Sequence, residues 1–228
     1  TMVALFIIST FLCFILVDYI LHHRKQQKIQ SPALVSEKFL IPRGYFFSPN
    51  HLWVHLLPSG NAQIGIDDFL QKIIGTIEHI HLVPNNSFVR KGEPLMEVAQ
   101  GEKTMTFTSP LTGRISMQNK EILEARTSLS SDPYFAGWIL EIIPEHIGEE
   151  IKSLSLAEQV EQWLKNEISR FRDFIAHQQT QLAYAHNGIT MFDGGIPING
   201  VLQNADKKIW SEFEQQFLAT EPKNEIVQ

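Results

Sequence analysis

Residues 97–110, with the sequence EVAQGEKTMTFTSP, constrain the fold more than any other stretch, because they predict two short strands joined by a tight turn. From residue 104 onward, threonines alternate with Met and Phe, which is the period-two pattern of a strand with one buried face. Gly101 permits the positive backbone dihedral that a tight hairpin turn needs. We therefore expect a β-hairpin whose tip presents Glu102 and Lys103. A lysine on such a tip is where a swinging-arm cofactor would be attached.

Short stretches of strand character fill the middle of the chain, and residues typical of turns separate them. The stretches are residues 45–47, 52–56, 62–66, 76–82, 87–89, 114–117 and 137–143. One short helix is expected among them, capped by Asp67 or Asp68, continuing through Gln71 and ended by Gly75. Many short strands with glycine and proline turns predict a mainly β domain, either a small sandwich or a flattened barrel.

The composition excludes several classes of function. The 228 residues include 25 acidic and 19 basic side chains, a net charge of −6, so the clustered positive charge of a nucleic-acid-binding protein is missing. Cys13 is the only cysteine, which excludes an intrachain disulfide and a cysteine-rich metal cluster. No stretch resembles a nucleophile triad or a phosphate-binding loop, and we expect a protein that is not an enzyme.

The N-terminal region predicts a membrane anchor. Residues 2–21 are mostly Val, Leu, Ile and Phe, and about 20 such residues cross the hydrocarbon core of a bilayer as a helix. The alternative, a cleaved secretory signal, is disfavoured because no basic residue precedes this run and no small-x-small pattern follows it. The basic residues Arg24, Lys25 and Lys28 then place the rest of the chain in the cytoplasm. We expect a single transmembrane helix over residues 1–23, a basic flank and linker over residues 24–39, and a location in a bacterial inner membrane.

A set of residues between about Leu40 and Pro144 resembles a known family in order and spacing. The set consists of His51-Leu52-Trp53-Val54, Ile64-Gly65-Ile66, Asp68-Phe69, Gly75, Gly92-Glu93, Glu97-Val98, Ser109-Pro110 with Gly113, and Ser131-Asp132-Pro133-Tyr134 with Gly137-Trp138. These residues are similar to those of the glycine cleavage system H protein. The resemblance implies a lipoyl-type barrel-sandwich hybrid over residues 40–148. It also implies the family's cofactor, a lipoyl group that is amide-linked to a lysine at the hairpin tip and shuttles an aminomethyl group between enzymes.

The chain departs from this family at the tip. Counting from either Glu97-Val98 or Ser109-Pro110, the family's lysine position falls on Glu102, and Lys103 stands one residue later. A shift of one residue along a strand turns a side chain to the opposite face. The family's usual glutamate after the first histidine is Leu52 here. We therefore expect no bound cofactor, and the alternative is a lipoyl group on Lys103.

A helical extension is predicted over residues 149–228. Ser155-Leu156-Ala157-Glu158 has the pattern of a capping box, and Asn187-Gly188 is a plausible stop for the long helix that follows. Its helically spaced stripe comprises Leu156, Val160, Trp163, Leu164, Ile168, Phe171, Phe174, Ile175, Gln178 and Leu182. After a Gly- and Pro-rich segment at residues 192–197, a second helix is expected over residues 205–219, with Ile209, Trp210, Phe213 and Phe217 on one face. These apolar faces either fold back on the β domain or dock on another subunit.

Three histidines are candidates for special roles. His79 and His81 lie two residues apart on a predicted strand and share a face, but no third ligand is evident nearby, so no metal site is expected. His51 precedes Trp53 in the part of the domain that lies near the lipoyl end in H proteins. Without a cofactor lysine, its simplest role is hydrogen bonding within the barrel.

These features together favour a non-catalytic, membrane-anchored subunit that scaffolds or stabilises a larger inner-membrane assembly, with a redox complex as one candidate. Its partners are expected to be other subunits of that complex, bound through the transmembrane helix and the C-terminal helices. One alternative is an active lipoyl carrier, modified on Lys103, that passes an acyl, aminomethyl or redox group between enzymes at the membrane. Another is an adaptor that recruits a soluble partner through the face of the barrel.

Overall fold

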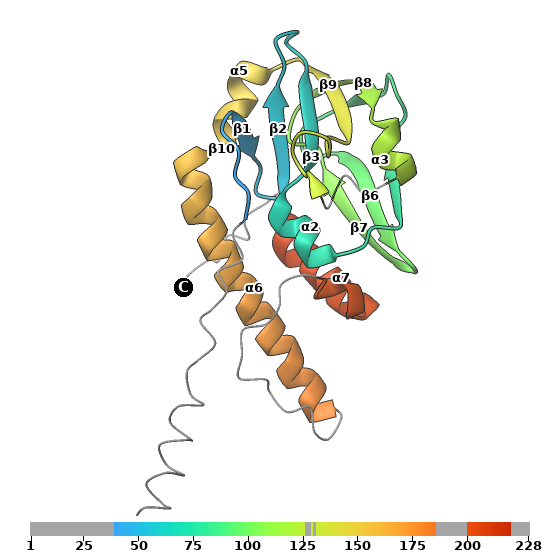
Figure 1. Ribbon diagram of the computed structural model, residues 1–228, viewed down its shortest axis with the longest axis vertical. Coiled ribbons are helices and arrows are strands. Elements are labelled where there is room, and N and C mark those ends of the chain that lie inside the picture. The colour runs from blue at the N-terminus through green and yellow to red at the C-terminus, as the bar shows by residue number, and fades with distance from the viewer. Residues whose placement is uncertain (1–38, 126–128, 130, 186–199, 220–228) are drawn as a thin grey trace, which may run out of the picture. The chain divides into compact units, whose positions relative to one another are not determined.

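The structure is a computed structural model that describes residues 39–125, 129, 131–185 and 200–219, and strands dominate its first hundred residues (Figure 1). Two antiparallel sheets form the β domain, one of seven strands in the order β10-β1-β2-β3-β9-β8-β5 and one of three strands in the order β4-β6-β7. The strands are β1 (Tyr45–Phe47), β2 (Leu52–Leu56), β3 (Ala62–Ile66), β4 (His79–Leu82), β5 (Phe88–Val89), β6 (Pro94–Gln100), β7 (Lys103–Thr108), β8 (Gly113–Gln118), β9 (Leu140–Pro144) and β10 (Ser155–Leu156). The predicted mainly β class is confirmed.

The buried side chain of Trp53, on strand β2 of the larger sheet, is the reason why position 65 on the neighbouring strand is a glycine. The indole is fully buried, and its Nε1 donates hydrogen bonds to the carbonyl oxygens of Ile66 at 3.1 Å and Pro133 at 3.0 Å. Gly65 is the cross-strand partner of Trp53. A Cβ on Gly65 would lie 2.5 Å from the Cζ2 atom of the indole, so only glycine fits this position.

The β6–β7 hairpin has the predicted register. Gln100 pairs with Lys103, which leaves Gly101 and Glu102 as a two-residue turn. Gly101 has φ = 58°, at the first central position, where a type II′ turn takes glycine. Lys103 lies on the same side of β7 as the buried Met105, whereas Glu102 is exposed at the turn.

The helices are α2 (Asp68–Ile74), α3 (Lys120–Ala125), α5 (Ile147–Glu150), the 3-10 helix η1 (Ile151–Ser153), α6 (Ala157–Ala185), the 3-10 helix η2 (Leu202–Asn204), α7 (Lys207–Phe213) and the π-helix η3 (Glu214–Leu218). The predicted short helix begins as expected, because the Asp67 side chain accepts a hydrogen bond from the Leu70 amide and so caps α2. The expected capping box has another role, since Ser155 pairs with Phe47 in the sheet and the long helix starts at Ala157. α3, α5 and η1 were not predicted, because each has only six residues or fewer and no strong apolar period.

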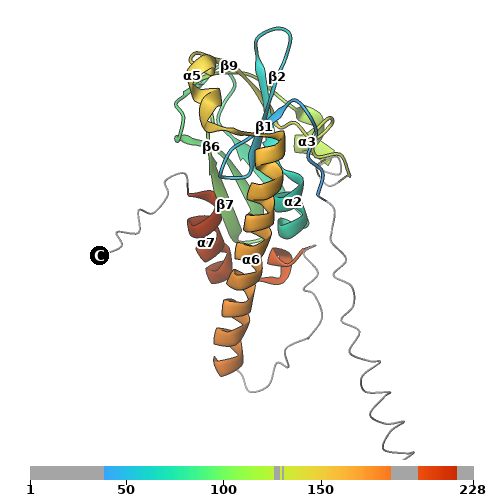
Figure 2. The same ribbon diagram turned by 90° about the vertical axis from the view of Figure 1, so that its left-hand side faces the viewer.

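The extension folds back on the β domain rather than leaving its apolar faces open. Figure 2 shows α6 running past α2, with α7 beside β7. Phe171 of α6 contacts Phe69 of α2 and Phe213 of α7, with ring centroids 6.1 and 5.9 Å apart. Docking on a partner was one expectation for five aromatic residues of the extension. Trp163 is half-buried, and the other four are buried inside the chain: Phe171, Phe174, Trp210 and Phe213. The physical reason is that the β domain does not close its own core at α2: the ring of Phe69 is buried, and Phe171 of α6 packs against it.

Several sequence-based predictions fall outside the described residues. These are the transmembrane helix, the basic flank and most of the linker at residues 1–38, the helix stop at Asn187-Gly188, and the Gly- and Pro-rich segment at residues 192–197. Among the residues that the structure does describe, none of the helices combines the length and apolar character needed to cross a bilayer.

Candidate functional site

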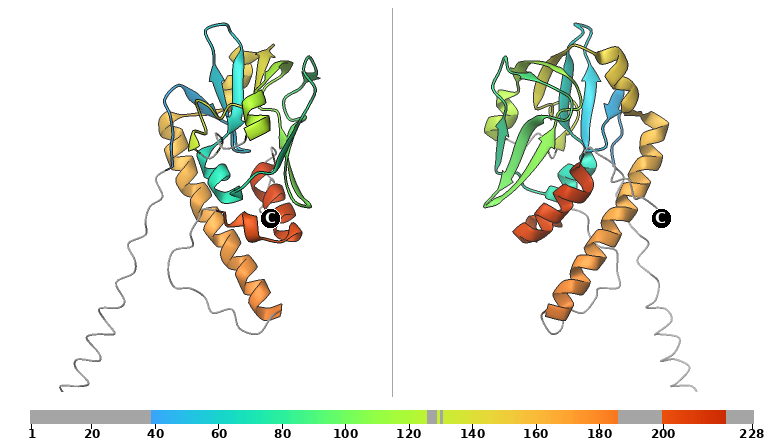
Figure 3. Two further views of the ribbon diagram at one scale, coloured as in Figure 1. Left: turned by 45° about the vertical axis from the view of Figure 1, so that its right-hand side comes forward. Right: turned by 180° about the vertical axis from the view of Figure 1, so that it is seen from behind.

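The hairpin tip is the first candidate site, and the C-terminal extension binds the lysine that follows its turn. Lys103 Nζ donates hydrogen bonds to the carbonyl oxygens of Gln203 at 2.7 Å and Ala205 at 3.2 Å. It also lies 5.0 Å from the ring centroid of Trp210, within the range of a cation–π interaction. Figure 3 shows α7 crossing beside the end of the β6–β7 hairpin. Lys103 is therefore engaged by its own chain, while Glu102, at the tip, has no amine to offer.

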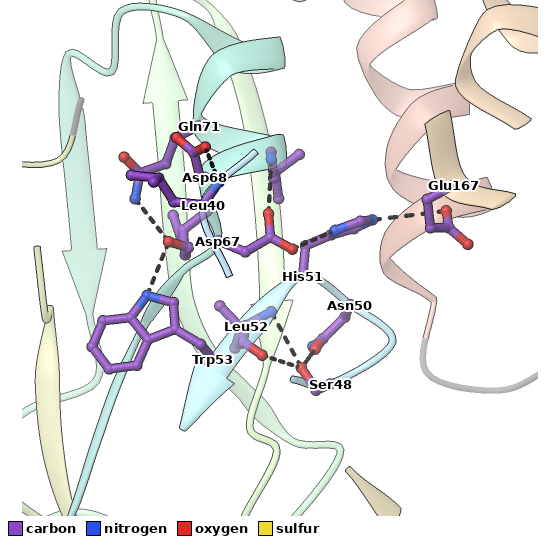
Figure 4. Close-up of polar contacts among 12 residues, drawn as sticks. Leu40, Ser48, Asn50, His51, Leu52, Trp53, Asp67, Asp68, Gln71 and Glu167 are labelled. Carbon is purple, nitrogen blue, oxygen red and sulfur yellow. Dashed lines mark hydrogen bonds and ion pairs between the residues drawn. The ribbon is translucent and has the colours of Figure 1, made fainter. Parts of the chain in front are cut away.

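The second candidate site is a buried charge centre around His51. His51 has φ = 61°, uncommon for a residue other than glycine, and its side chain is fully buried. Its Nδ1 donates to Asp67 Oδ2 at 2.8 Å, and its Nε2 lies 3.8 Å from Glu167 Oε2 on α6 (Figure 4). The longer distance is that of an ion pair, not of a hydrogen bond. The side chains of Asp67 and Glu167 are only 3% and 6% exposed, so the imidazole is held between two buried carboxylates.

Local structure places each member of this centre. The turn before β2 is closed by Ser48, whose Oγ donates to Asn50 Oδ1 and accepts from the Leu52 amide at 3.2 Å. The Asp67 amide donates to the His51 carbonyl oxygen at 3.0 Å, which joins that turn to the start of α2. Asp67 thereby holds the imidazole with one carboxylate oxygen and caps α2 with the other.

The electrostatics show that His51 carries a positive charge at neutral pH. Burial by itself lowers the pKa of His51, but the carboxylates of Asp67 and then Glu167 outweigh it and raise the pKa to about 9. Burial raises the pKa of Glu167, but His51 and Arg170 hold it below its usual value. A fully buried imidazole that keeps its proton has no access to a substrate and cannot act as a general base at neutral pH. The centre therefore links α6 to the β domain, in addition to the hydrogen bonding within the barrel that we expected of His51.

The sequence contains a signal that Glu167 is buried beside a partner, but it contains none for the groups that surround Lys103 Nζ, which we call the cage of Lys103. Glu167 falls at helical spacing between Leu164 and Phe171 on the buried face of α6, and an acid at such a position indicates a buried partner. The groups that hold Lys103 are two main-chain carbonyls and one aromatic ring, and no residue pattern reveals them.

The histidine pair of β4 lies at the surface of the smaller sheet. His79 and His81 are both exposed, and their rings stack with centroids 6.2 Å apart. Across the described part of the chain, no three His, Cys, Asp or Glu side chains are arranged to hold a metal ion.

Two packed antiparallel sheets with a protruding β6–β7 hairpin define a β domain of the lipoyl type. The family model described as "Glycine cleavage H-protein" matches residues 45–167, more than half of the chain, and the chain belongs to this family. The match ends inside α6, so the rest of the extension lies beyond it.

Two relatives with similar sequences agree with this assignment. The chain is 31% identical over 129 residues to a "Probable glycine cleavage system H protein" of Pyrococcus abyssi, which covers 57% of this chain and 96% of that protein. It is 27% identical over 110 residues to a "Glycine cleavage system H protein" of Hydrogenovibrio crunogenus, covering 48% of this chain and 85% of the relative. A crystal structure of a glycine cleavage system H protein from Mycobacterium marinum superposes with a TM-score of 0.46 and 24% identity, covering 52% of this chain and 94% of that one.

The residues at the tip do not fit the family's lipoyl group in this arrangement. The exposed turn position holds Glu102, which cannot form the amide. The neighbouring amine, on Lys103, is half-buried and donates to two carbonyl oxygens of the extension. Attachment of an arm would require Nζ to leave both of these contacts.

Proposed function

We propose that this protein is a non-catalytic H-protein-family subunit that scaffolds or stabilises a larger membrane-associated assembly and carries no lipoyl group. The observation that carries the proposal is the engagement of Lys103 Nζ by Gln203 and Ala205. A carrier needs a free amine on an accessible tip, whereas this tip offers a carboxylate and a lysine bound by its own chain. Function then resides in what the domain contacts and not in a cofactor it carries.

The anchor and the partners belong to this proposal. Residues 2–21 are assigned as the span, with the β domain on the cytoplasmic side, on the strength of the basic residues that follow the apolar run. The aromatic faces of α6 and α7 are used within the chain, so the proposed contacts with other subunits move from those helices to the span. Protease added to intact spheroplasts should leave the chain beyond residue 30 uncut, and cleavage there from outside would reverse the orientation.

Mass spectrometry of the protein from its native host tests the cofactor. The peptide that contains Lys103 should carry no lipoyl amide when lipoate is supplied. A lipoylated protein of the same cells serves as the control that the ligase and lipoate are present. Substantial lipoylation of Lys103 would refute the scaffold proposal.

The second candidate function is a lipoyl carrier with the arm on Lys103. It is favoured by membership of the family and by the position of Lys103 directly after the turn. The same peptide decides between the two, and gentle detergent extraction followed by identification of co-purifying subunits distinguishes a stable assembly from a freely shuttling carrier.

A further inference from the structure

The extension presents a built site for an ammonium group, and Lys103 fills it. Gln203 lies in η2, and Ala205 is the residue that ends it. Carbonyl oxygens at a helix end lack partners within the helix, and a lysine is well suited to satisfy them. The third wall of the site is the indole of Trp210, which is 1% exposed and fixed by a hydrogen bond from its Nε1 to the Leu202 carbonyl at 2.6 Å.

The extension holds the hairpin at a second point. The Thr106 amide of β7 donates to Glu214 Oε1 at 2.7 Å. β7 is an edge strand of the smaller sheet, and this contact satisfies one of its outward amides. Two contacts along β7, one at the lysine and one three residues later, therefore seat residues 200–219 against the hairpin.

We propose that residues 200–219 form a lid that closes on the charged amine of Lys103, and that lid closure and acylation of Lys103 exclude each other. Acylation by an activated acyl donor, such as an acyl adenylate or an active ester, joins deprotonated Nζ to the acyl carbon. The bond from that carbon to the leaving group breaks, and the proton of Nζ passes to solvent. The amide that results has no charge and a single N–H, so it keeps at most one of the two carbonyl contacts and loses the attraction to Trp210.

The exclusion is reciprocal because the lid and the acyl group compete for the same atom. A closed lid engages Nζ with two carbonyl oxygens and shields it from the acyl donor, and an acylated Lys103 lacks the charge that holds the lid closed. The lid is independent of the proposed function. Native lipoylation would refute the scaffold but would place the protein in the open state of the lid, and an unmodified Lys103 would leave it closed.

Hydrogen exchange of the full chain in detergent micelles measures lid closure. Lys103→Gln, which replaces the ammonium with a neutral amide, should raise exchange across residues 200–219 by about tenfold. Lys103→Arg keeps the charge and its attraction to Trp210, so it should raise exchange less than Lys103→Gln does. Lys120→Gln, at an exposed lysine on α3, is the matched control and should change nothing in the lid. Unchanged exchange in Lys103→Gln, or an equal rise in Lys103→Gln and Lys103→Arg, would overturn the proposal.

The reactivity of the amine gives the reverse measurement. Acetyl N-hydroxysuccinimide ester, followed by peptide mass spectrometry, should acetylate Lys103 about tenfold more slowly than Lys120 in the unaltered protein. Glu214→Ala removes the second contact of the lid without touching an aromatic core residue, and it should speed acetylation of Lys103 while leaving Lys120 unchanged. Equal rates at the two lysines in the unaltered protein would refute the lid.

Discussion

The buried charge of His51 gives the stability of this protein a pH dependence of known sign. Its pKa in the folded protein is about 9, above the ordinary 6.5, so its contribution is complete below about pH 6.5 and is lost as the pH rises through about 9. One pKa unit corresponds to about 1.36 kcal/mol, so the full contribution of protonated His51 is about 3 kcal/mol. The pKa of Glu167 is lowered, so its contribution is present above about 4.5 and is lost as the pH falls through its folded-state pKa. The free energy of unfolding should therefore be highest between about pH 4.5 and 6.5 as far as this centre is concerned.

Glu167→Gln removes the charge through which α6 contacts His51 of the β domain, together with the ion pair that Glu167 makes with Arg170 on the same helix. The amide keeps the size of the side chain and removes its charge. Since Asp67 contributes more than Glu167 to the raised pKa of His51, the variant should lose less than half of the roughly 3 kcal/mol, and the pKa of its His51 should fall. Glu161→Gln, at an exposed position on the same helix, is the matched control and should be neutral.

Urea unfolding of the full chain in micelles at pH 6.5, 8 and 9.5 measures the stability, and NMR of the histidine ring measures the pKa directly. The unaltered protein should lose stability between pH 6.5 and 9.5. Glu167→Gln should lose less over that interval, because the gap between the folded-state and unfolded-state pKa values of His51 is smaller in this variant. A His51 that titrates near 6.5, or equal pH slopes in Glu167→Gln and Glu161→Gln, would refute the reasoning.

Three further changes test the packing, each by the midpoint of urea unfolding. Gly65→Ala should cost about 1–3 kcal/mol because its Cβ would overlap Trp53. Gly148→Ala, in helix α5 where a Cβ meets no atom within 4 Å, is the control and should cause no loss of stability. Phe213→Ala should cost about 3–5 kcal/mol, since this fully buried ring joins α7 to α6; a loss below 1 kcal/mol would mean that the extension is not seated as described. Asp67→Ala should cost more than the roughly 0.5–2 kcal/mol of an ordinary cap, because it also leaves the charged histidine with one partner fewer; a smaller loss would argue that the histidine is neutral.

The β domain and its hairpin could be predicted because their signals are local. Alternation along β7 and glycine at the turn set the register of residues 97–110, and the spaced residues from His51 to Trp138 indicated the family. The position of Glu102 at the tip followed from counting alone. Helical spacing likewise indicated α6 and the helix that begins at Lys207.

Tertiary structure decided where the side chains of these elements go. Sequence periodicity identifies an apolar face but not the surface that covers it. Only the contact between Phe171 and Phe69 shows that the face of α6 is covered by the protein's own β domain and not by a partner. The charge centre depends on His51 and Glu167, which are far apart in the sequence and become neighbours only through the packing of α6. The cage of Lys103 is built largely from main-chain carbonyls, which every residue carries. Side-chain identities therefore determine the hairpin, whereas only the folded path of the extension determines which groups Lys103 of that hairpin binds.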